Sequence, residues 1–515
     1  MQAVRGAGTA GLAADGTPVE AANPAAATVA AGVVAACAGP ELVTPEPVRW
    51  SAEEVVSALA ARRISTREYV AVLNDRAKAL NSLNAFISRN PVRLAAEAAA
   101  LDDRRAQGSI GALAGLPIGI KDNIEVTGFP TTAGSAVLRG WWPTRDAAVV
   151  KPLRAADGLM YGKTHMTEFA FDTGGGNLTW GPAHNPYDRR MLPGGSSSGS
   201  AVAVVAGMVP AALGTDTGGS VRIPAALCGC VGFRPSTGRY PQAGIVPLSH
   251  TRDTPGLMAR RVADIAMLDA VIAGTGEAAE RKAPSDLRIG IPRHYFHEDL
   301  DDEVEAVVGN AMARLTAVGA TLVPVDLAGL FDLVKAIRSA LVLFEIPREI
   351  AAFLYSRGLR ISLTDLASQL AAPSFRQAFL DEAGAKAVTA EEYRAALTVH
   401  RPALRALYER VFAADPKLDA LLAPATPLPA RPQGKGETII FKGRDVNNNR
   451  AYTRNVSPPG TAGLPCLTLP AGLTAGGLPV GIDLTGRPDG DRPLIGVAQT
   501  IEAVLGPLPP PHLKA

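Results

Sequence analysis

Three short segments combine glycine, a change of local pattern and a side chain that can take part in proton transfer or covalent chemistry. Lys121 directly follows the apolar run 116–120, and a buried strand ending there would desolvate its ammonium group and lower its pKa. Ser196 lies in a Gly/Ser run before an apolar stretch, and Ser220 follows two glycines that let a substrate carbonyl approach backbone N–H groups. A neutral lysine base with serine hydroxyls indicates nucleophilic chemistry, with Ser220 well placed as the nucleophile.

Each segment taken alone also has a purely structural interpretation. A lysine at a strand end is often solvated or ion-paired, and a Gly/Ser run often forms a turn or caps a helix. Asp216 and Arg222 flank Ser220 and are consistent with a mutual pair, with contacts to loop carbonyls or with a role in binding. A phosphate-binding loop is excluded, because neither glycine-rich stretch contains the GxxxxGK(S/T) pattern.

Histidines and cysteines give little support to metal or disulfide chemistry. The seven histidines include no HExxH pattern. The four cysteines, Cys37, Cys228, Cys230 and Cys466, form neither a disulfide framework nor two pairs at zinc-ligand spacing. We therefore expect buried free thiols, no metal and no cofactor.

The elements that must position these residues alternate between strands and helices. Capping boxes, Ser51 with Glu54 and Ser65 with Glu68, each precede apolar residues at helical spacing and predict two helices. Further along, Ala-rich helical stretches alternate with short apolar runs bounded by glycine or proline. These runs are 116–120, 159–161, 211–213, 287–291, 321–325, 421–422, 466–469 and 478–484. The alternation predicts an α/β fold with a large central mixed β-sheet covered by helices on both faces.

Composition shifts divide the chain into a body and two tails. Residues 1–48 are rich in Ala, Gly and Pro and predict a flexible N-terminal tail, followed by a catalytic domain over 49–505 and a C-terminal tail over 506–515. Within the domain, 328–415 has a helical pattern throughout. We expect this helical insert either to cover a substrate pocket or to pad the surface.

Length and composition exclude several classes of protein. The 515 residues are 47% hydrophobic and 19% charged, which is typical of a globular chain and not of a disordered one. The net charge of +2 provides no basic field for binding nucleic acid. No strongly apolar run approaches the roughly 18 residues that a membrane span needs, so we expect no integral membrane association and a cytoplasmic location. Export as a lipoprotein through Cys37 is the alternative, although no positive cluster precedes that cysteine.

The sequence motifs around the three reactive residues are similar to those of the amidase signature family, and the resemblance extends from about residue 50 to residue 500. The matching motifs are 115–123 (GLPIGIKDN), 162–164 (GKT), 184–186 (HNP), 193–197 (PGGSS), 214–224 (GTDTGGSVRIP) and 232–238 (GFRPSTG). One departure follows Ser196, where this chain reads Ser-Ser-Ser-Gly-Ser and many members have Ser-Ser-Gly-Gly. It affects only the expected shape of that loop.

The resemblance implies a Ser–cis-Ser–Lys catalytic set and no histidine. Ser220 would be the acylated nucleophile, Ser196 the bridging serine held by a cis peptide, and Lys121 the ultimate base. The oxyanion hole would be formed by the backbone N–H groups of Thr217, Gly218, Gly219 and Ser220.

The resemblance also suggests which residues would contact the substrate. Phe169, Ala170, Phe171 and Asp172 match a family segment that lines the reacting centre, and Ser197 would hydrogen-bond to Lys121. Phe169 and Phe171 are equally consistent with the core, and Ser197 with a helix cap.

Within this family, three phrases are similar to indoleacetamide and mandelamide hydrolases: 247–256 (PLSHTRDTPG), 288–296 (RIGIPRHYF) and, in part, 453–463 (TRNVSPPGTAG). We therefore expect hydrolysis of a small aryl or arylalkyl amide, through a serine-linked acyl-enzyme, to a carboxylic acid and ammonia or amine. The alternatives are an anilide, carbamate or fatty amide hydrolase, the glutaminase subunit of a tRNA-dependent amidotransferase, and a silent binding protein on the same scaffold. The expected partner is a small-molecule amide, and a homodimer is left open.

Overall fold

The computed structural model describes residues 46–513, apart from 276–278 and 435–437. Most of the predicted N-terminal tail, with Cys37, therefore lies outside the described residues. The boundary predicted at residue 48 differs from the structure, because Glu46–Arg49 form a 3-10 helix and Val48 is buried. At the other end, the Tyr187 hydroxyl donates to the Pro509 carbonyl at 2.8 Å, so the segment predicted as a C-terminal tail contacts the body.

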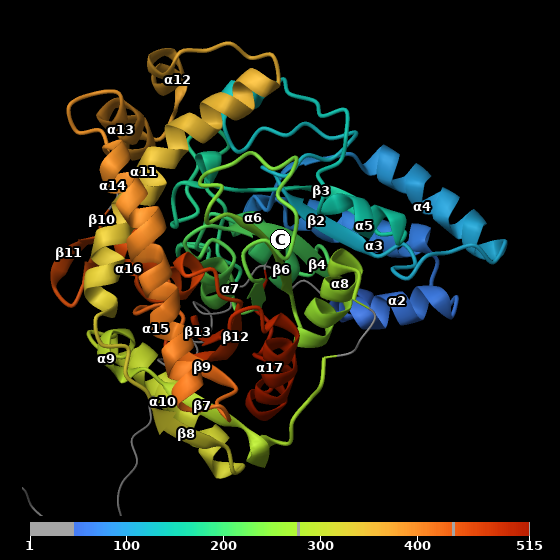
Figure 1. The fold of residues 1–515 in the computed structure, drawn as a ribbon. Coiled ribbons are helices and arrows are strands. Elements are labelled where there is room, and N and C mark those ends of the chain that lie inside the picture. The colour runs from blue at the N-terminus through green and yellow to red at the C-terminus, as the bar shows by residue number, and fades with distance from the viewer. Residues whose placement is uncertain (1–45, 276–278, 435–437, 514–515) are drawn as a thin grey trace, which may run out of the picture. The chain divides into compact units, whose positions relative to one another are not determined.

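A mixed sheet of eleven strands runs through the molecule in the order β1-β3-β2-β4-β6-β5-β12-β13-β9-β7-β8 (Figure 1). Strand β2 is parallel to both β3 and β4, and β7 is parallel to both β8 and β9, whereas the other neighbours are antiparallel. The α/β fold with a large mixed sheet is thereby confirmed.

The strands have the following bounds: β1 Phe86–Arg89, β2 Pro117–Lys121, β3 Leu159–Thr164, β4 Ala211–Asp216, β5 Val231–Arg234, β6 Thr254–Ala259, β7 Arg288–Ile291, β8 Thr321–Pro324, β9 Ala420–Pro424, β12 Cys466–Leu473 and β13 Pro479–Thr485. Strands β10 (Thr438–Phe441) and β11 (Arg444–Asn447) form a separate hairpin. Every apolar run predicted as a strand overlaps one of the eleven strands, with bounds that differ by one or a few residues, and the pattern does not indicate β1, β5 or β6.

The helices before the insert are α2 Ala52–Ala60, α3 Thr66–Ala79, α4 Pro91–Ala106, α5 Val150–Ala155, α6 Ser198–Val205, α7 Arg222–Cys228, α8 Val262–Ala273, α9 Arg293–Phe296 and α10 Asp302–Ala317. Helices α16 (Asn448–Thr461) and α17 (Asp491–Leu505) follow it. Both predicted capping boxes are present at the starts of α2 and α3. Helices α6 and α7 pack together against the centre of the sheet, as do α8 and α17, and Figure 1 shows helices on both sides of the strands.

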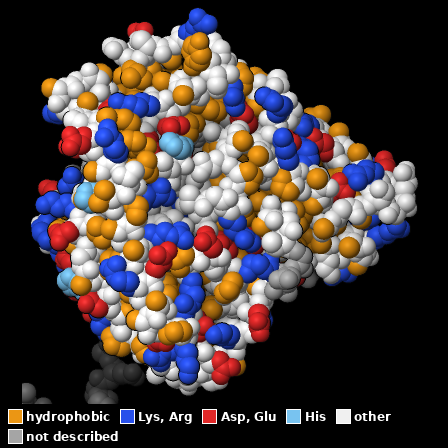
Figure 2. All heavy atoms as spheres, in the orientation of Figure 1, with side chains coloured by type: hydrophobic (Ala, Val, Ile, Leu, Met, Phe, Trp, Pro, Cys, Tyr) orange, Lys and Arg blue, Asp and Glu red, His pale blue; other side chains and the backbone are white. Residues whose placement is uncertain are grey.

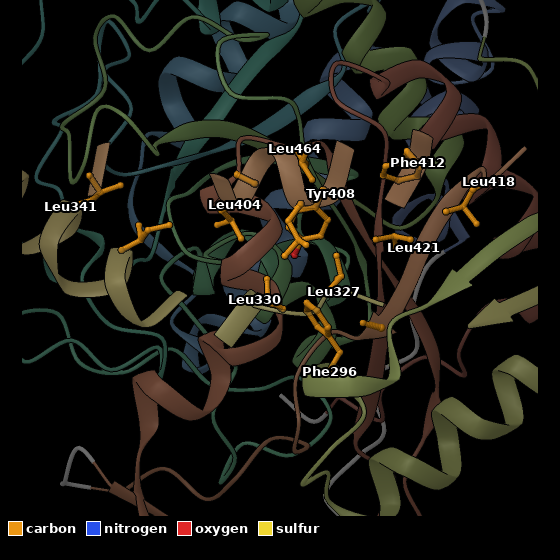
Figure 3. Packing of buried hydrophobic residues seen from close by; sticks show 14 of the residues in the cluster. Phe296, Leu327, Leu330, Leu341, Leu404, Tyr408, Phe412, Leu418, Leu421 and Leu464 are labelled. Atoms are coloured by element: carbon orange, nitrogen blue, oxygen red, sulfur yellow. The ribbon is translucent and has the colours of Figure 1, made fainter. Parts of the chain in front are cut away.

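The segment predicted as a helical insert contains α11 Leu330–Ser356, α12 Leu363–Gln369, α13 Pro373–Glu382, α14 Ala390–Ala395 and α15 Arg401–Ala414. A cluster of buried apolar side chains joins it to the sheet (Figure 3). In that cluster, Leu341 of α11 and Leu404 of α15 belong to the same packed group as Leu421 of β9. Burial of this kind contributes about 25 cal/mol for each Å² of apolar surface, so the insert is anchored through its own core.

Charged side chains of both signs are interspersed over the face shown in Figure 2, and basic residues do not gather there into one large patch. This distribution agrees with the near-neutral net charge of +2. Within the described residues, no helix combines the length and apolarity needed to cross a membrane.

Candidate active site

Lys121 is the last residue of β2, and its side chain is completely buried. Burial removes water from the ammonium group and lowers the pKa of Lys121 to about 7, although Asp216 and Asp253 oppose the shift. A substantial fraction of this lysine is therefore neutral near pH 7, and the neutral amine has a lone pair that can accept a proton.

The Nζ atom of Lys121 has three hydrogen-bond partners. It lies 2.7 Å from Ser196 Oγ, 2.7 Å from Thr215 Oγ1 and 3.3 Å from the Thr215 carbonyl oxygen. The Asn123 side-chain amide also donates to Thr215 Oγ1, at 3.1 Å. When Lys121 is neutral, its two N–H groups can donate to the two Thr215 oxygens, which directs the lone pair towards Ser196.

The Gly195–Ser196 peptide bond is cis, and Ser196 is completely buried two residues before α6 begins. The next residue, Ser197, connects this segment to β4 and to the loop that follows it. Its hydroxyl donates to the Thr215 carbonyl at 3.2 Å and accepts from the Thr215 N–H at 3.3 Å, and its backbone N–H donates to the Ser220 carbonyl at 3.1 Å. Ser197 therefore positions the backbone on which Ser196 and Ser220 lie.

Ser220 lies in the loop between β4 and α7, and 6% of its surface is exposed. It lines a cavity, whereas Lys121 and Ser196 are completely buried and do not line it. No hydrogen bond joins the Ser196 and Ser220 side chains in the described part of the chain. The structure thus brings the lysine and Ser196 into direct contact and connects Ser220 to them through backbone contacts.

Asp216 organises the loop that carries Ser220. Its carboxylate accepts from the Gly219 N–H at 2.9 Å and from the Val221 N–H at 3.2 Å. Arg222 and Arg234 both form ion pairs with it at 3.0 Å. Although burial alone would raise the pKa of Asp216, these two arginines hold it well below its usual range.

The contacts of Asp216 bear on two interpretations of the sequence. Asp216 and Arg222 form a mutual pair, and Arg222 also pairs with Asp483 at 3.1 Å. The Gly219 N–H, predicted as an oxyanion-hole donor, is already donated to Asp216 because the loop folds over that carboxylate. The Thr217 side chain is fixed as well, since its hydroxyl donates to Asp253 at 2.5 Å.

The cavity in front of Ser220 has a volume of about 680 Å³. Its walls come from the Ser220 loop, the segment predicted to contact the substrate, insert helices α11 and α13, and α16. The lining residues are Ala170, Phe171, Asp172, Thr173, Thr217, Gly218, Ser220, Leu248, Arg252, Val342, Leu343, Pro373, Ser374, Gln377, Ala378, Asp381, Asn447, Asn449, Arg450, Thr453 and Ser457. A volume of this size is ample for a small-molecule ligand.

The residues predicted to contact the substrate separate into two groups. Ala170, Phe171 and Asp172 line the cavity. Phe169 does not, because it is buried in an apolar cluster 5.9 Å from the Phe375 ring, measured between ring centroids. Ser197 does not line it either. Of the two roles considered from the sequence, a hydrogen bond to Lys121 and a helix cap, its hydroxyl has neither, because it bonds to Thr215 and makes no capping hydrogen bond to α6.

Sequence reasoning missed Thr215, Arg252 and Ser457. Thr215 stands inside one of the matching motifs, but its contact with Lys121 depends on the parallel pairing of β2 with β4, which places Ile120 opposite Leu213. Arg252 also lies in one of the matching phrases, and nothing in that phrase indicates that it is buried. Within the described ranges, no group of three or more His, Cys, Asp or Glu side chains is placed to hold a metal ion.

The chain is similar to known proteins over most of its length. The sequence model of the Amidase family matches residues 68–495. The chain is 35% identical over 455 residues to an indoleacetamide hydrolase of Allorhizobium ampelinum, and the match covers 88% of this chain and 98% of the relative. It is 38% identical over 469 residues to a mandelamide hydrolase of Pseudomonas putida, with 87% and 90% covered.

A third relative is one of the subunits of the glutamyl-tRNA(Gln) amidotransferase of an Anaeromyxobacter species, 36% identical over 495 residues, with 90% of this chain and 98% of the relative covered. Among solved structures, a peptide amidase in complex with the competitive inhibitor chymostatin has a TM-score of 0.78 at 31% identity, with 90% of this chain and 99% of that chain covered. The chain therefore belongs to the Amidase family, and it is an enzyme that hydrolyses amide C–N bonds.

Proposed function

We propose that this enzyme hydrolyses small primary arylalkyl amides to a carboxylic acid and ammonia through an acyl-enzyme on Ser220. Two observations carry the proposal: the 2.7 Å contact between the buried Lys121 and Ser196 side chains, and the position of Ser220 in the wall of the cavity. The named activities of the indoleacetamide and mandelamide hydrolase relatives support this substrate class.

The first half of the reaction forms the acyl-enzyme. Neutral Lys121 accepts the Ser196 hydroxyl proton while Ser196 accepts that of Ser220, and the Ser220 oxygen attacks the amide carbonyl carbon. The carbonyl oxygen becomes an oxyanion, which the N–H groups of Thr217, Gly218 and Ser220 would stabilise, while that of Gly219 holds the loop on Asp216. Removing one such donor typically costs about 3 to 4 kcal/mol of transition-state stabilisation.

The relay then runs in reverse. Ser196 delivers its proton to the amide nitrogen as the C–N bond breaks, and Lys121 returns a proton to Ser196, so ammonia leaves as a neutral molecule. Water next attacks the acyl ester, passes a proton to the same relay and releases the acid, which restores the Ser220 hydroxyl. Each proton accepted by Lys121 is returned within the cycle.

An aromatic wall favours an aryl group on the substrate. Phe171 lines the cavity, and its ring centroid lies 4.7 Å from that of buried Phe375 on α13. Val342 and Leu343 of α11 add aliphatic surface to the same cavity. We infer that the insert covers the acyl group of the substrate, because its helices supply this part of the wall.

The amidotransferase relative supports a second candidate, a glutaminase subunit that passes ammonia to a partner. Product analysis by mass spectrometry separates the two. The panel contains indoleacetamide, mandelamide, an anilide, an aryl carbamate and glutamine, with Ser220→Ala as the control. We expect acid and ammonia from the two arylalkyl amides only, and none from the control.

Two other results would change the conclusion. Turnover of the anilide or carbamate alone would keep the mechanism and replace the substrate class. Selective turnover of glutamine would favour the role in an amidotransferase.

A further inference from the structure

Arg252 is a buried cation in the cavity wall, and most of its donors have no partner. Its side chain forms one hydrogen bond within the described residues, from Nη2 to Ser457 Oγ at 3.1 Å. The Nε atom is buried without an acceptor, and only 4% of the residue surface is exposed. A guanidinium group carries five N–H donors, and a buried one is normally paired with a carboxylate.

The nearby carboxylates are engaged elsewhere. Asp253 accepts from the Thr217 hydroxyl at 2.5 Å and from the Leu248 N–H at 2.8 Å. Glu345 accepts from hydroxyls, including that of Tyr393 at 2.8 Å. Within the described ranges, no ion pair of 4.0 Å or less reaches Arg252. Its guanidinium group therefore lies in the wall of a cavity without an opposite charge in contact.

Burial, with Arg234 and Arg401 nearby, lowers the pKa of Arg252 to about 10. Arg252 nevertheless stays protonated near neutral pH, because about 10 is still some three units higher. The cavity wall thus keeps a positive charge under the conditions in which Lys121 becomes neutral.

Arg252 lies beside the loop expected to bind the substrate carbonyl. A Cβ atom placed on Gly218 would be 3.5 Å from Arg252 Nη2 and 3.8 Å from Ser457 Oγ. Gly218, Ser220, Arg252 and Ser457 all line the same cavity. A ligand oxygen held by Arg252 would therefore belong to the part of the molecule next to the reacting carbon.

We propose that Arg252 and Ser457 form a carboxylate-binding subsite within this cavity. A planar guanidinium can bind a carboxylate through two parallel hydrogen bonds, and the Ser457 hydroxyl can supply a third. The carboxylate has two sources, the acid released by hydrolysis or an amide substrate that also carries a carboxylate. The first source, the acid product, rests on the proposed function.

The test measures binding to Ser220→Ala protein, in which turnover is blocked. Calorimetry compares phenylacetate, neutral phenylacetamide and phenylmalonic acid monoamide, with and without Arg252→Gln. We expect Arg252→Gln to weaken carboxylate binding at least tenfold and phenylacetamide binding less than twofold. Loss confined to the monoamide assigns the subsite to the substrate, and loss of phenylacetate binding assigns it to the product.

Arg450 lines the same cavity at an exposed position and provides the matched control. Equal weakening by Arg450→Gln would show that any positive charge in the cavity wall has the same effect, and it would overturn the proposal. Equal changes in affinity for all three ligands, or no change for any of them, would also overturn it. If Arg252→Gln fails to fold, Arg252→Lys and Ser457→Ala replace it. Each should weaken carboxylate binding at least threefold, and unchanged affinity in both would overturn the subsite.

The same data separate this proposal from the proposed function. If the wild-type protein hydrolyses arylalkyl amides and Arg252→Gln does not change carboxylate binding, only the proposed subsite is ruled out. If carboxylate binding depends on Arg252 but the protein does not hydrolyse arylalkyl amides, only the proposed substrate class is ruled out.

Discussion

The Nζ atom of Lys121 lies 2.7 Å from Ser196 Oγ, and both side chains are completely shielded from solvent. This contact joins the end of β2 to the segment that enters α6. Burial lowers the pKa of Lys121, so a substantial fraction of the amine is neutral near pH 7. The short distance lets its lone pair accept a proton from the Ser196 hydroxyl. In the proposed mechanism this lysine is the base, and no histidine is needed.

Replacing the lysine tests this relationship directly. Lys121→Met keeps most of the side-chain volume but removes the base, so we expect kcat to fall by about 10²- to 10⁴-fold, the range that general-base catalysis typically contributes. Steady-state kinetics on an arylalkyl amide, with circular dichroism to verify folding, measures the effect. Full activity in a folded variant would remove Lys121 from the mechanism.

The pH profile should report the same group. Because the pKa of Lys121 is lowered to about 7 and the neutral form is the active one, kcat/KM should rise with pH through a single ionisation near 7 and then level off. Activity is lost as the pH falls below that value. A profile that is flat from pH 5 to 9 would contradict the assignment.

Lowering this pKa also links folding to pH. Between about pH 7 and the ordinary lysine value of about 10.4, the unfolded chain binds a proton that the folded chain does not, so this group makes stability rise with pH. Urea unfolding at pH 7 and pH 9 measures the difference. In Lys121→Met this contribution should be absent, and an identical slope in both proteins would contradict the linkage.

The sequence predicts much of the sheet, because buried parallel strands are short apolar runs between glycines and prolines. Strands β2, β3 and β7 have this pattern. Strand β6 is different, since Pro255 and Gly256 lie within it and both residues weaken a strand signal. The sequence pattern therefore gives the fold class but does not indicate strand β6, which pairs with β4.

For the site, the residue types and their positions at strand and helix ends lead to the catalytic set that we propose. The partners of these residues come from elsewhere in the fold. Arg234, which binds Asp216, lies on β5, and Ser457 lies on α16. The contacts of Arg234 with Asp216 and of Ser457 with Arg252 depend on strand order and helix packing, which local sequence patterns do not contain.

Thr215 should act as a positioning residue for the lysine. Thr215→Val keeps the shape but removes the hydroxyl that lies 2.7 Å from Lys121 Nζ, so the amine loses one of its fixed partners. We expect kcat to fall by about 10- to 100-fold, corresponding to about 1 to 3 kcal/mol for a lost buried partner, with little change in KM. Thr215→Ser should retain most of the activity, and an equal loss in both variants would favour a packing role.

Asp216 should be critical for stability. Asp216→Asn leaves Arg222 and Arg234 buried with a weakened partner, and breaking a buried ion pair typically costs about 3 to 5 kcal/mol. The free energy of unfolding in urea measures the loss. Glu409→Gln removes one partner of a partly exposed pair with Arg405 and should change stability by less than about 1 kcal/mol. Equal losses of unfolding free energy in the two variants would show that the Asp216 ion pairs contribute no more to stability than the partly exposed pair does.

Phe171 should determine the preference for aryl groups. Its ring lines the cavity and packs against Phe375, so Phe171→Ala removes an apolar surface that an aromatic acyl group would cover. We expect KM for phenylacetamide to rise about tenfold, corresponding to roughly 1.4 kcal/mol, and KM for propionamide to change less than threefold. Leu380→Ala, at an exposed position on α13 that is not part of the cavity lining, provides the control. If Phe171→Ala raised both KM values equally, Phe171 would shape the cavity without recognising the aromatic ring.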